Sequence, residues 1–565
     1  MKYTSALMLS FILLTASAQK YTVSDSILIT LKNGATLTAT VCWNNADTIP
    51  LPVILMFNIY ASPQINKIYA SIAASKGYVG VVVNTRGKRL SRQIIEPFEH
   101  DAEDAYEIID WISKQSWCNG KVGMYGASYL GFSQWASVKK LHPALKTIVP
   151  QAAVGVGIDF PMQNNVFSSY MLQWIHYVTN SKTIDPVDFG NTRHWDSVYK
   201  IWYLSGRPFN SLDTIDSRPN EIFQRWLKHP GYDDYWKKMT PQNIEYANIN
   251  IPILTITGYY DADQLGAMYY FKQHTTFNKN ANHYLIIGPY DHDGVQSPST
   301  PSKILGYQTD TLAGIKIYNL IFNWFNYTLK DSARPALLQN KINYQVMGAN
   351  KWEHKSSLSE MNNDSLTFFL SDNKVLSDSI KKKNYYSSLT VNYDDRSDTA
   401  NMDKEIQITD SILYINKNML VFATVPLKQD IEMNGSMYGN IHAMLNKKDA
   451  DLNLQLYELT PDGKYFLLNN NVLRASYTKD NNRRILLKPG KNEFIPISNT
   501  FFISKLIKKN SKLVFVIGVN KNYNYQINYG TGKDVSIETI SDGNIPLTLK
   551  IYPDSFIKIP ILLRK

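Results

Sequence analysis

The sequence predicts a doubly wound α/β domain with a mostly parallel sheet, followed by a β-sandwich domain. Between residues 19 and 333, continuous apolar runs typical of buried strands alternate with helical patterns. This order predicts a parallel sheet with helices on both faces. Beyond residue 333, short apolar runs follow one another without intervening helices and are separated by Asn, Asp and Gly, which is typical of a sandwich.

The elements of the first domain follow a regular order. An alternating pattern around the turn at residues 32–34 predicts an antiparallel hairpin at the edge of the sheet. The buried strands expected after it are 52–57, 78–83, 122–125, 147–151, 252–258 and 283–288. The helices expected between and after these strands are 65–76, 101–114, 132–138 and 314–329.

The periodic pattern breaks down between residues 154 and 248, where Trp and Tyr are frequent and only helical fragments can be recognised. An insertion at this point lies above the carboxyl ends of the strands and predicts a lid over a pocket. We therefore expect an α/β domain from residues 19–153 and 249–333, and a helical cap from residues 154–248. The sandwich is expected from residues 334–565, with its first strand at 342–347.

Composition excludes several classes of function. A net charge of +11 is spread over scattered lysines, with residues 381–383 as the only tight cluster, so we expect a solvated surface and no nucleic-acid partner. A disulfide between Cys42 and Cys118 stays open, although two cysteines in 565 residues are more often small core residues. No Cys/His spacing suggests zinc, and we expect neither a metal nor a cofactor.

Residues 1–18 are predicted to be a secretory signal peptide. Lys2 precedes an apolar core at residues 6–14, and the small-x-small sequence at residues 16–18 is typical of a cleavage site. No cysteine follows the core, and no other run of ~18 apolar residues predicts a membrane span. We therefore expect a periplasmic or secreted protein.

Small residues surround Ser128 in the run 119–131. A strand is expected before Ser128 and a helix after it, so Ser128 lies at the apex of a tight turn to which the helix points its N-terminus. Gly126, Ala127 and Gly131 would let backbone and substrate come close. This is the geometry of a nucleophile elbow, and the alternative is a Gly-rich turn without chemistry.

An elbow serine requires a base and a carboxylate, which follow in the order Ser, Asp or Glu, His in an α/β-hydrolase. Asp261 follows one late predicted strand and His292 follows the next, so order and placement both fit. Either residue alone would be an ordinary polar loop residue. His274 and His283 compete with His292, but one looks helical and the other opens a strand.

A tetrahedral oxyanion needs at least two donors. The backbone N–H of Tyr129, the residue after the nucleophile, is the first candidate. The phenol of Tyr60, just after the strand at 52–57, is the second. Because the chain contains 37 tyrosines, the alternative for Tyr60 is an aromatic residue that happens to lie at a strand end.

These residues resemble the serine hydrolases that include X-prolyl dipeptidyl-peptidases, cocaine-esterase-type enzymes, α-amino-acid ester hydrolases and glutaryl-cephalosporin acylases. The resemblance covers nearly the whole mature chain. Its landmarks are Asn84-Thr-Arg-Gly, Trp117-Cys-Asn-Gly-Lys-Val-Gly-Met-Tyr-Gly-Ala-Ser-Tyr, His229-Pro-Gly-Tyr-Asp-Asp-Tyr-Trp, Tyr259-Tyr-Asp, Gly288-Pro-Tyr-Asp-His and Leu473-Arg-Ala-Ser-Tyr.

The resemblance implies roles for residues already singled out. It implies a triad of Ser128, Asp261 and His292, and a side-chain oxyanion donor at Tyr60. It also implies that the C-terminal sandwich is a jelly roll. The sequence departs from the family at Asn84, where many members carry Asp, and after Tyr60, where Ala-Ser replaces a Gly-Lys type of turn. Neither departure touches the triad.

The resemblance also suggests how a substrate ammonium is bound. In the α-amino-acid ester hydrolases, two acidic residues shortly after the catalytic Asp and a third after the elbow helix bind this group. Asp263 matches the first, Gln264 replaces the second, and Asp159 is the nearest candidate for the third. The alternative is that Asp263 caps the next helix.

The sequence therefore predicts an exported serine hydrolase that cleaves acyl esters or amides through an acyl-enzyme on Ser128. Its partner would be a small acyl ester or amide or a short peptide, and a homo-oligomer is left open. Three substrate classes compete: α-amino acyl groups, X-Pro dipeptides, and esters without an amino group. A catalytically silent glycan- or peptide-binding protein is the alternative of another class. Since the base must be neutral, activity should rise with pH through the titration of His292, at about pH 6–7.

Overall fold

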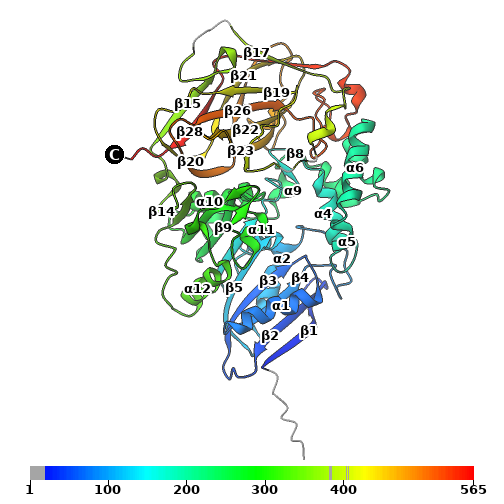
Figure 1. Cartoon of the computed structure of the whole chain (residues 1–565). Coiled ribbons are helices and arrows are strands. Elements are labelled where there is room, and N and C mark those ends of the chain that lie inside the picture. The colour runs from blue at the N-terminus through cyan, green and yellow to red at the C-terminus, as the bar shows by residue number, and fades with distance from the viewer. Residues whose placement is uncertain (1–19, 381–384, 403, 405, 565) are drawn as a thin grey trace, which may run out of the picture.

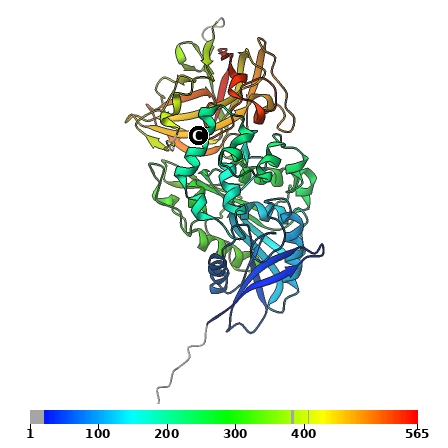
Figure 2. The same cartoon turned by 90° about the vertical axis from the view of Figure 1, so that its right-hand side faces the viewer.

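The computed structural model describes residues 20–380, 385–402, 404 and 406–564. The predicted signal peptide and the lysine cluster at residues 381–383 lie outside these residues. Figure 1 shows the α/β domain in blue to green at the bottom, the C-terminal strands in yellow to red at the top, and the inserted helices in teal, mostly on the right. Figure 2 shows the same order after a turn of 90°.

The first domain contains, within the described residues, a ten-stranded sheet of order β1-β2-β4-β3-β5-β6-β9-β10-β13-β14. The strands are β1 (Tyr21–Thr30), β2 (Thr36–Asn44), β3 (Leu51–Asn58), β4 (Val79–Asn84), β5 (Cys118–Ser128), β6 (Leu145–Ala153), β9 (Ile253–Tyr260), β10 (His283–Asp291), β13 (Ile342–Val346) and β14 (Lys351–Lys355). Neighbours from β4 to β13 are parallel, while β1, β2 and β14 pair antiparallel. The mostly parallel sheet and its edge hairpin are confirmed.

Helices cover both faces of this sheet, which explains its continuous apolar strands. Along β3, the side chains of Val53, Leu55 and Phe57 pack into the cluster that contains α2, α3 and α10. Ile54 and Met56 point to the other face and pack into the cluster that contains α1 and α12. The helices are α1 (Pro63–Ser75), α2 (Asp101–Ser113), α3 (Tyr129–Ser137), α10 (Gln264–Phe277), α11 (His292–Gln296) and α12 (Ile317–Leu329).

Local sequence explains where these helices begin. The Ser62 side chain accepts the N–H of Ile65 at 3.4 Å, and a proline occupies the first turn of α1. The first turn of α2 carries the acidic residues Asp101, Glu103 and Asp104, a composition typical of a helix N-terminus.

The insertion between β6 and β9 consists mainly of short helices. Its elements are β7 (Met162–Gln163), β8 (Val166–Phe167), α4 (Tyr170–Thr179), α5 (Pro186–Phe189), α6 (Thr192–Ser205), α7 (Leu212–Ile215), α8 (Glu221–Leu227) and α9 (Asp234–Lys237). Trp195, Trp202, Trp226 and Trp236 are all buried. The aromatic residues that interrupt the sequence pattern therefore form the core of this layer.

The C-terminal domain contains, in the described part of the chain, antiparallel sheets of nine and five strands. The larger comprises β15 (Asp364–Leu370), β16 (Leu376–Ser377), β17 (Ser387–Val391), β20 (Ile431–Ser436), β21 (Tyr438–Leu445), β24 (Asn492–Ile497), β25 (Phe502–Ile507), β27 (Leu547–Ile551) and β28 (Phe556–Ile561). The smaller comprises β18 (Thr409–Asp410), β19 (Met419–Ala423), β22 (Asp451–Leu459), β23 (Tyr465–Arg474) and β26 (Lys512–Val519). Apolar side chains of both sheets share one hydrophobic cluster, including Ile441 and Leu454. Its finer description as a jelly roll stays a prediction.

One predicted strand lies in the other domain. We expected residues 342–347 to open the sandwich, but β13 pairs in parallel with β10, and β14 then forms the edge of the first sheet. The α/β sheet therefore extends to Lys355 and does not end at residue 333. A short apolar run looks the same in either sheet, but the preceding helix α12 makes β10-α12-β13 a parallel crossover unit.

Two smaller expectations can also be compared with the structure. Cys42 and Cys118 are both buried and free, so the disulfide left open by the sequence is absent from this structure. Among the described residues, no helix has the length and apolar character needed to cross a bilayer.

Candidate active site

Ser128 lies where β5 ends and α3 begins, with φ 61° and ψ −123°. Residues other than glycine rarely adopt a positive φ, so this backbone is strained. A Cβ on Gly126 would lie 2.5 Å from Cβ of Leu130, and one on Gly131 would lie 2.6 Å from Cα of Ala153. Only glycine at these two positions permits the tight turn, which has the geometry of a nucleophile elbow.

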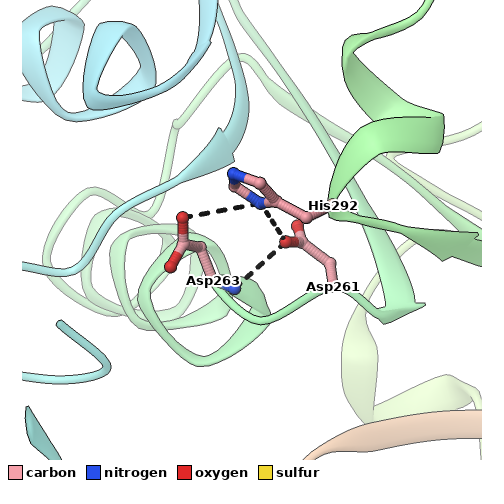
Figure 3. Close-up of side chains that lie close together, drawn as sticks. All are labelled: Asp261, Asp263 and His292. Atoms are coloured by element: carbon pink, nitrogen blue, oxygen red, sulfur yellow. Dashed lines mark hydrogen bonds and ion pairs between the residues drawn. The ribbon is translucent and has the colours of Figure 1, made fainter. Parts of the chain in front are cut away.

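Asp261 and His292 follow the neighbouring parallel strands β9 and β10, so they meet at the carboxyl ends of these strands (Figure 3). His292 Nδ1 lies 2.8 Å from Asp261 Oδ1, and the fully buried carboxylate also accepts the Thr257 hydroxyl at 2.7 Å. His274 and His283 instead bond to each other at 3.1 Å in the interior, where β10 begins. The pair of Asp261 and His292 thus has the geometry of a carboxylate that orients a general base.

The hydroxyl of Tyr60 lies 3.4 Å from Ser128 Oγ. Trp174 Nε1–H donates to the Tyr60 oxygen at 3.2 Å, which leaves the phenolic proton free to point at the reacting centre. Burial raises the pKa of Tyr60 to about 12, although its bonds to Ser128 and Trp174 oppose the rise, so the phenol stays protonated. Tyr129 opens α3, and its N–H therefore has no partner within the helix. The two candidate oxyanion donors therefore flank Ser128, and their role stays a prediction.

The side chain of Tyr129 is held at its far end. Its hydroxyl donates to Asp101 Oδ2 at 2.8 Å and accepts the N–H of Phe98 at 3.0 Å. Phe98 has φ 73°, and its ring stacks on Tyr129 with centroids 4.8 Å apart. Burial raises the pKa of Asp101 to about 8, against the hydrogen bond from Tyr129. These contacts fix the residue that carries the backbone oxyanion donor.

A pocket of about 490 Å³ contains Ser128, Tyr60, His292 and Asp263 in its lining. Aromatic side chains that form much of its wall are Phe98, Phe160, Tyr170, Trp174, Tyr177 and Phe189. All but Phe98 belong to the inserted segment between β6 and β9. The insertion therefore supplies much of the apolar wall, and the strand ends and the segments that follow them supply Ser128, Asp263 and His292.

Asp263 occupies the N-cap position of α10, but its side chain makes no capping hydrogen bond. Its Oδ2 lies 3.6 Å from His292 Nδ1, and the residue lines the pocket while only 8% exposed (Figure 3). The alternative that this carboxylate caps the helix is therefore wrong. Gln264 is fully buried, and its side-chain amide hydrogen-bonds to backbone atoms outside the pocket.

The structure places Asp159 in a different role from Asp263. Its Oδ1 accepts the N–H of Gly155 at 2.8 Å, and its Oδ2 accepts the N–H of Gly266 in α10. Both oxygens thus tie the start of the insertion to α10. Burial, with the nearby Asp263 charge, raises the pKa of Asp159 well above its ordinary value. Ammonium binding by Asp159 stays a prediction.

The charges around His292 alter its basicity. Burial lowers the pKa of His292, but the Asp263 carboxylate and the hydrogen bond with Asp261 outweigh burial and raise the pKa above the ordinary 6.5. Burial likewise raises the pKa of Asp263, an effect that His292 opposes and Asp261 strengthens. The titrations of His292 and Asp263 are therefore coupled.

The same three side chains, Asp261, Asp263 and His292, bring two carboxylates and an imidazole close enough together for a metal ion. Their position beside the strained Ser128 is better explained by a role in proton transfer than by metal binding. In that role Nδ1 bonds to Asp261, which leaves Nε2 for proton transfer.

Three residues of the site were not predicted. Trp174 orients Tyr60, Asp101 holds Tyr129, and the Gln151 side chain donates to the carbonyl of Val295 at 2.6 Å, in the short helix that begins at His292. Each contact joins segments that are far apart in the sequence. No local pattern in the sequence could have indicated them.

Comparison with known proteins decides the family. Residues 33–294 match the family model for X-Pro dipeptidyl-peptidase (S15 family), and residues 338–500 match that for the X-Pro dipeptidyl-peptidase C-terminal non-catalytic domain. The chain is a serine hydrolase of the S15 and cocaine-esterase family. The predicted family, fold class and enzyme class are thus confirmed, and the silent binding protein is set aside.

Relatives of this serine hydrolase span nearly its whole length. It is 20% identical over 555 residues to a cocaine esterase from Rhodococcus sp., covering 92% of this chain and 95% of that protein. A solved α-amino acid ester hydrolase has a TM-score of 0.79 at 17% identity, covering 99% of this chain and 100% of that one. An aminopeptidase from a marine sediment archaeon, Thaumarchaeota archaeon, has a TM-score of 0.78 at 18% identity. The match covers 96% of this chain and 97% of that one. At these identities the solved structures support the fold.

The Tyr60→Phe variant tests the side-chain oxyanion donor. It removes the hydroxyl at constant shape, and we expect kcat to fall by roughly 100- to 1,000-fold. Tyr177→Phe is the matched control, since Tyr177 lines the same pocket with its ring centroid 5.7 Å from that of Tyr60. Steady-state kinetics on an activated ester measure both. A change in KM alone for Tyr60→Phe would make Tyr60 a binding residue.

The Asp263→Asn variant tests the electrostatics around His292. Removing a carboxylate destabilises the imidazolium and lowers its pKa, so the neutral base persists to lower pH. The acidic limb of kcat/KM should lie above pH 6–7 in the wild type and move down by about one unit or more in the variant. Asp293→Asn, which removes an exposed carboxylate with a weaker effect on His292, should shift it less. An unmoved or upward-shifted limb contradicts this account.

Proposed function

We propose that this enzyme hydrolyses small acyl esters or amides and prefers acyl groups with an α-amino substituent. The observation that carries the proposal is the Asp263 carboxylate, which lines the pocket, caps no helix and lies beside the catalytic imidazole. A substrate ammonium that takes the place of solvent there would pair with a largely desolvated carboxylate. A hydrogen bond to such a charged group contributes roughly 1.5–3 kcal/mol.

The position of Asp263 favours α-amino acyl groups over X-Pro dipeptides. Its carboxylate lies 3.6 Å from His292 Nδ1, next to the reacting centre. In an α-amino acyl ester the ammonium is on the carbon next to the scissile carbonyl. In an X-Pro dipeptide it is one residue further away, where the wall is formed by aromatic side chains.

The aromatic wall supports an apolar acyl side chain. Phe98 and Trp174 lie parallel with ring centroids 5.5 Å apart, and Phe160 meets Trp174 edge to face at 5.0 Å. Such rings favour a flat aromatic group through burial of area and edge-to-face contacts. We therefore place phenylglycine-type acyl groups first among the candidate substrates.

The proposed reaction follows from the geometry of the site. Ser128 Oγ attacks the scissile carbonyl carbon while His292 Nε2 accepts its proton, and Asp261 stabilises the imidazolium. The oxyanion is bound by the Tyr60 hydroxyl and the Tyr129 N–H. The imidazolium then protonates the leaving alkoxide or amine, which departs to give the acyl-enzyme. Water, deprotonated by His292, attacks the carbonyl carbon of this ester. The bond from that carbon to Ser128 Oγ then breaks, the imidazolium returns its proton to Oγ, and the carboxylic acid is released.

We also propose that the enzyme acts outside the cytoplasm. The support is the apolar core at residues 6–14 and the small-x-small sequence before Gln19. N-terminal sequencing of the mature protein tests this proposal: a mature chain that begins at Gln19 supports it, and one that retains the apolar core contradicts it.

A pair of esters tests the substrate preference. We expect Asp263→Asn to lower kcat/KM for a phenylglycine methyl ester by at least ~10-fold more than for the phenylacetic methyl ester, because only the first substrate carries an ammonium. The ratio of the two values is the measurement, taken on the pH plateau of each variant. Effects on His292 act on both substrates and cancel in this ratio.

Asp293→Asn is the matched control, because it removes a carboxylate from the same pocket but from an exposed position. Its ratio should stay close to that of the wild type. Equal losses on both esters in Asp263→Asn would contradict ammonium binding by Asp263 and favour esters without an amino group. Faster cleavage of Gly-Pro-p-nitroanilide than of either ester would favour the dipeptidyl-peptidase.

A further inference from the structure

The side chain of Gln264 joins the two domains beside the active site. Its Oε1 accepts the N–H of Phe502 at 2.6 Å, and its Nε2 donates to the carbonyl of Phe502 at 2.9 Å. The same Nε2 donates to the carbonyls of Gly258 at 2.9 Å and Tyr259 at 3.2 Å. Gln264 is fully buried, and Phe502 opens β25 of the sandwich. One amide therefore connects the end of β9 to the C-terminal domain.

Two neighbouring side chains strengthen this connection. The Tyr260 hydroxyl donates to the carbonyl of Leu467 in β23 at 2.9 Å. The ring of Tyr259 stacks on Phe502 with centroids 6.3 Å apart. Contacts to the sandwich thus lie on both sides of Asp261 and Asp263 in the sequence.

The sandwich side of the connection is itself fixed. The Asn469 side chain donates to the carbonyl of Phe501 at 2.7 Å, next to the residue that Gln264 holds. Further along β25, Met347 donates its N–H to the carbonyl of Ser504 at 3.1 Å and accepts that of Leu506 at 2.9 Å. Met347 directly follows β13, so β25 is bonded to the α/β domain at two separate places.

We propose that the sandwich positions the carboxylates of Asp261 and Asp263, and that Gln264 is the positioning residue through which it does so. The residues that line the active-site pocket all lie between positions 56 and 318, so the described part of the sandwich supplies no side chain to the pocket. Its contribution acts through the segment 258–264. Asp261 must remain at 2.8 Å from His292 Nδ1, and Asp263 at 3.6 Å, and both belong to this segment.

The arrangement also explains why an amide occupies position 264. The side chain accepts one N–H, and its NH2 group faces three carbonyls, to which its two N–H groups can donate if one of them is shared; a carboxylate cannot donate at all. If position 264 belonged to an ammonium-binding cluster, Gln264→Glu would improve cleavage of amino acyl esters. If it positions the carboxylates, a Glu oxygen would face three carbonyl oxygens, and activity would fall.

The experiment compares Gln264→Met, Gln264→Glu and Tyr260→Phe with Asn165→Gly. Asn165 also donates its side-chain amide across the domains, to the carbonyl of Asn481 at 2.9 Å, but lies outside the active-site pocket. Glycine suits its φ of 68°. Tyr260→Phe removes a single hydroxyl at constant shape and serves if the Gln264 variants do not fold. Circular dichroism and thermal unfolding establish the folded fraction.

We expect kcat/KM per folded chain to fall by roughly 10- to 100-fold on both esters in the two Gln264 variants, and by less in Tyr260→Phe. The acidic limb of the pH profile should move to lower pH, because displaced carboxylates stabilise the imidazolium less. Asn165→Gly should keep the wild-type kcat/KM and the wild-type acidic limb of the pH profile, whatever its thermal stability.

Three results would overturn the proposal. The first is a Gln264→Met variant that is less stable but has wild-type activity and pH limb, which would reduce Gln264 to an interface contact. The second is a Gln264→Glu variant with faster cleavage of the amino acyl ester. The third is a Tyr260→Phe variant with wild-type kcat/KM and a wild-type pH limb. This result is decisive if the Gln264 variants do not fold. The inference depends on the triad and not on substrate preference, so it stands or falls separately from ammonium binding by Asp263.

Discussion

The backbone of Ser128 adopts a positive φ that a serine rarely takes, and much of the surrounding structure depends on this constraint. It holds the hydroxyl at the apex between β5 and α3, with the N-terminus of the helix directed at the reacting centre. Gly126 and Gly131 are required because side chains there would collide with Leu130 and Ala153. The strain persists because packed strands on both sides of β5 leave the turn no alternative.

Parallel strands bring the other candidate catalytic groups to the same serine. Tyr60, Asp261 and His292 each follow the carboxyl end of a strand in one sheet, so their convergence is a property of the topology. What topology leaves open is their exact orientation. Contacts from outside the sheet supply it: Trp174 of the insertion bonds to Tyr60, and the sandwich holds the segment that carries Asp261.

The proposed triad could be recognised in the sequence because each member has a local signature. Ser128 lies among small residues between a strand and a helix, and Asp261 and His292 follow apolar strands in the expected order. Trp174 and Gln264 could not be predicted, because their partners lie far away in the sequence. The strand at residues 342–347 was assigned to the wrong sheet for a related reason, since pairing partners leave no trace in a short apolar run.

Detection of the acyl-enzyme tests the central claim most directly. The protein is mixed rapidly with an activated ester, quenched in acid, digested and analysed by mass spectrometry, with Ser128→Ala treated in parallel. The account predicts that wild-type protein carries one acyl group, on the peptide that contains Ser128, and that the variant carries none and loses several orders of magnitude in kcat. Acylation of another residue, or turnover near the wild-type rate in Ser128→Ala, would contradict it.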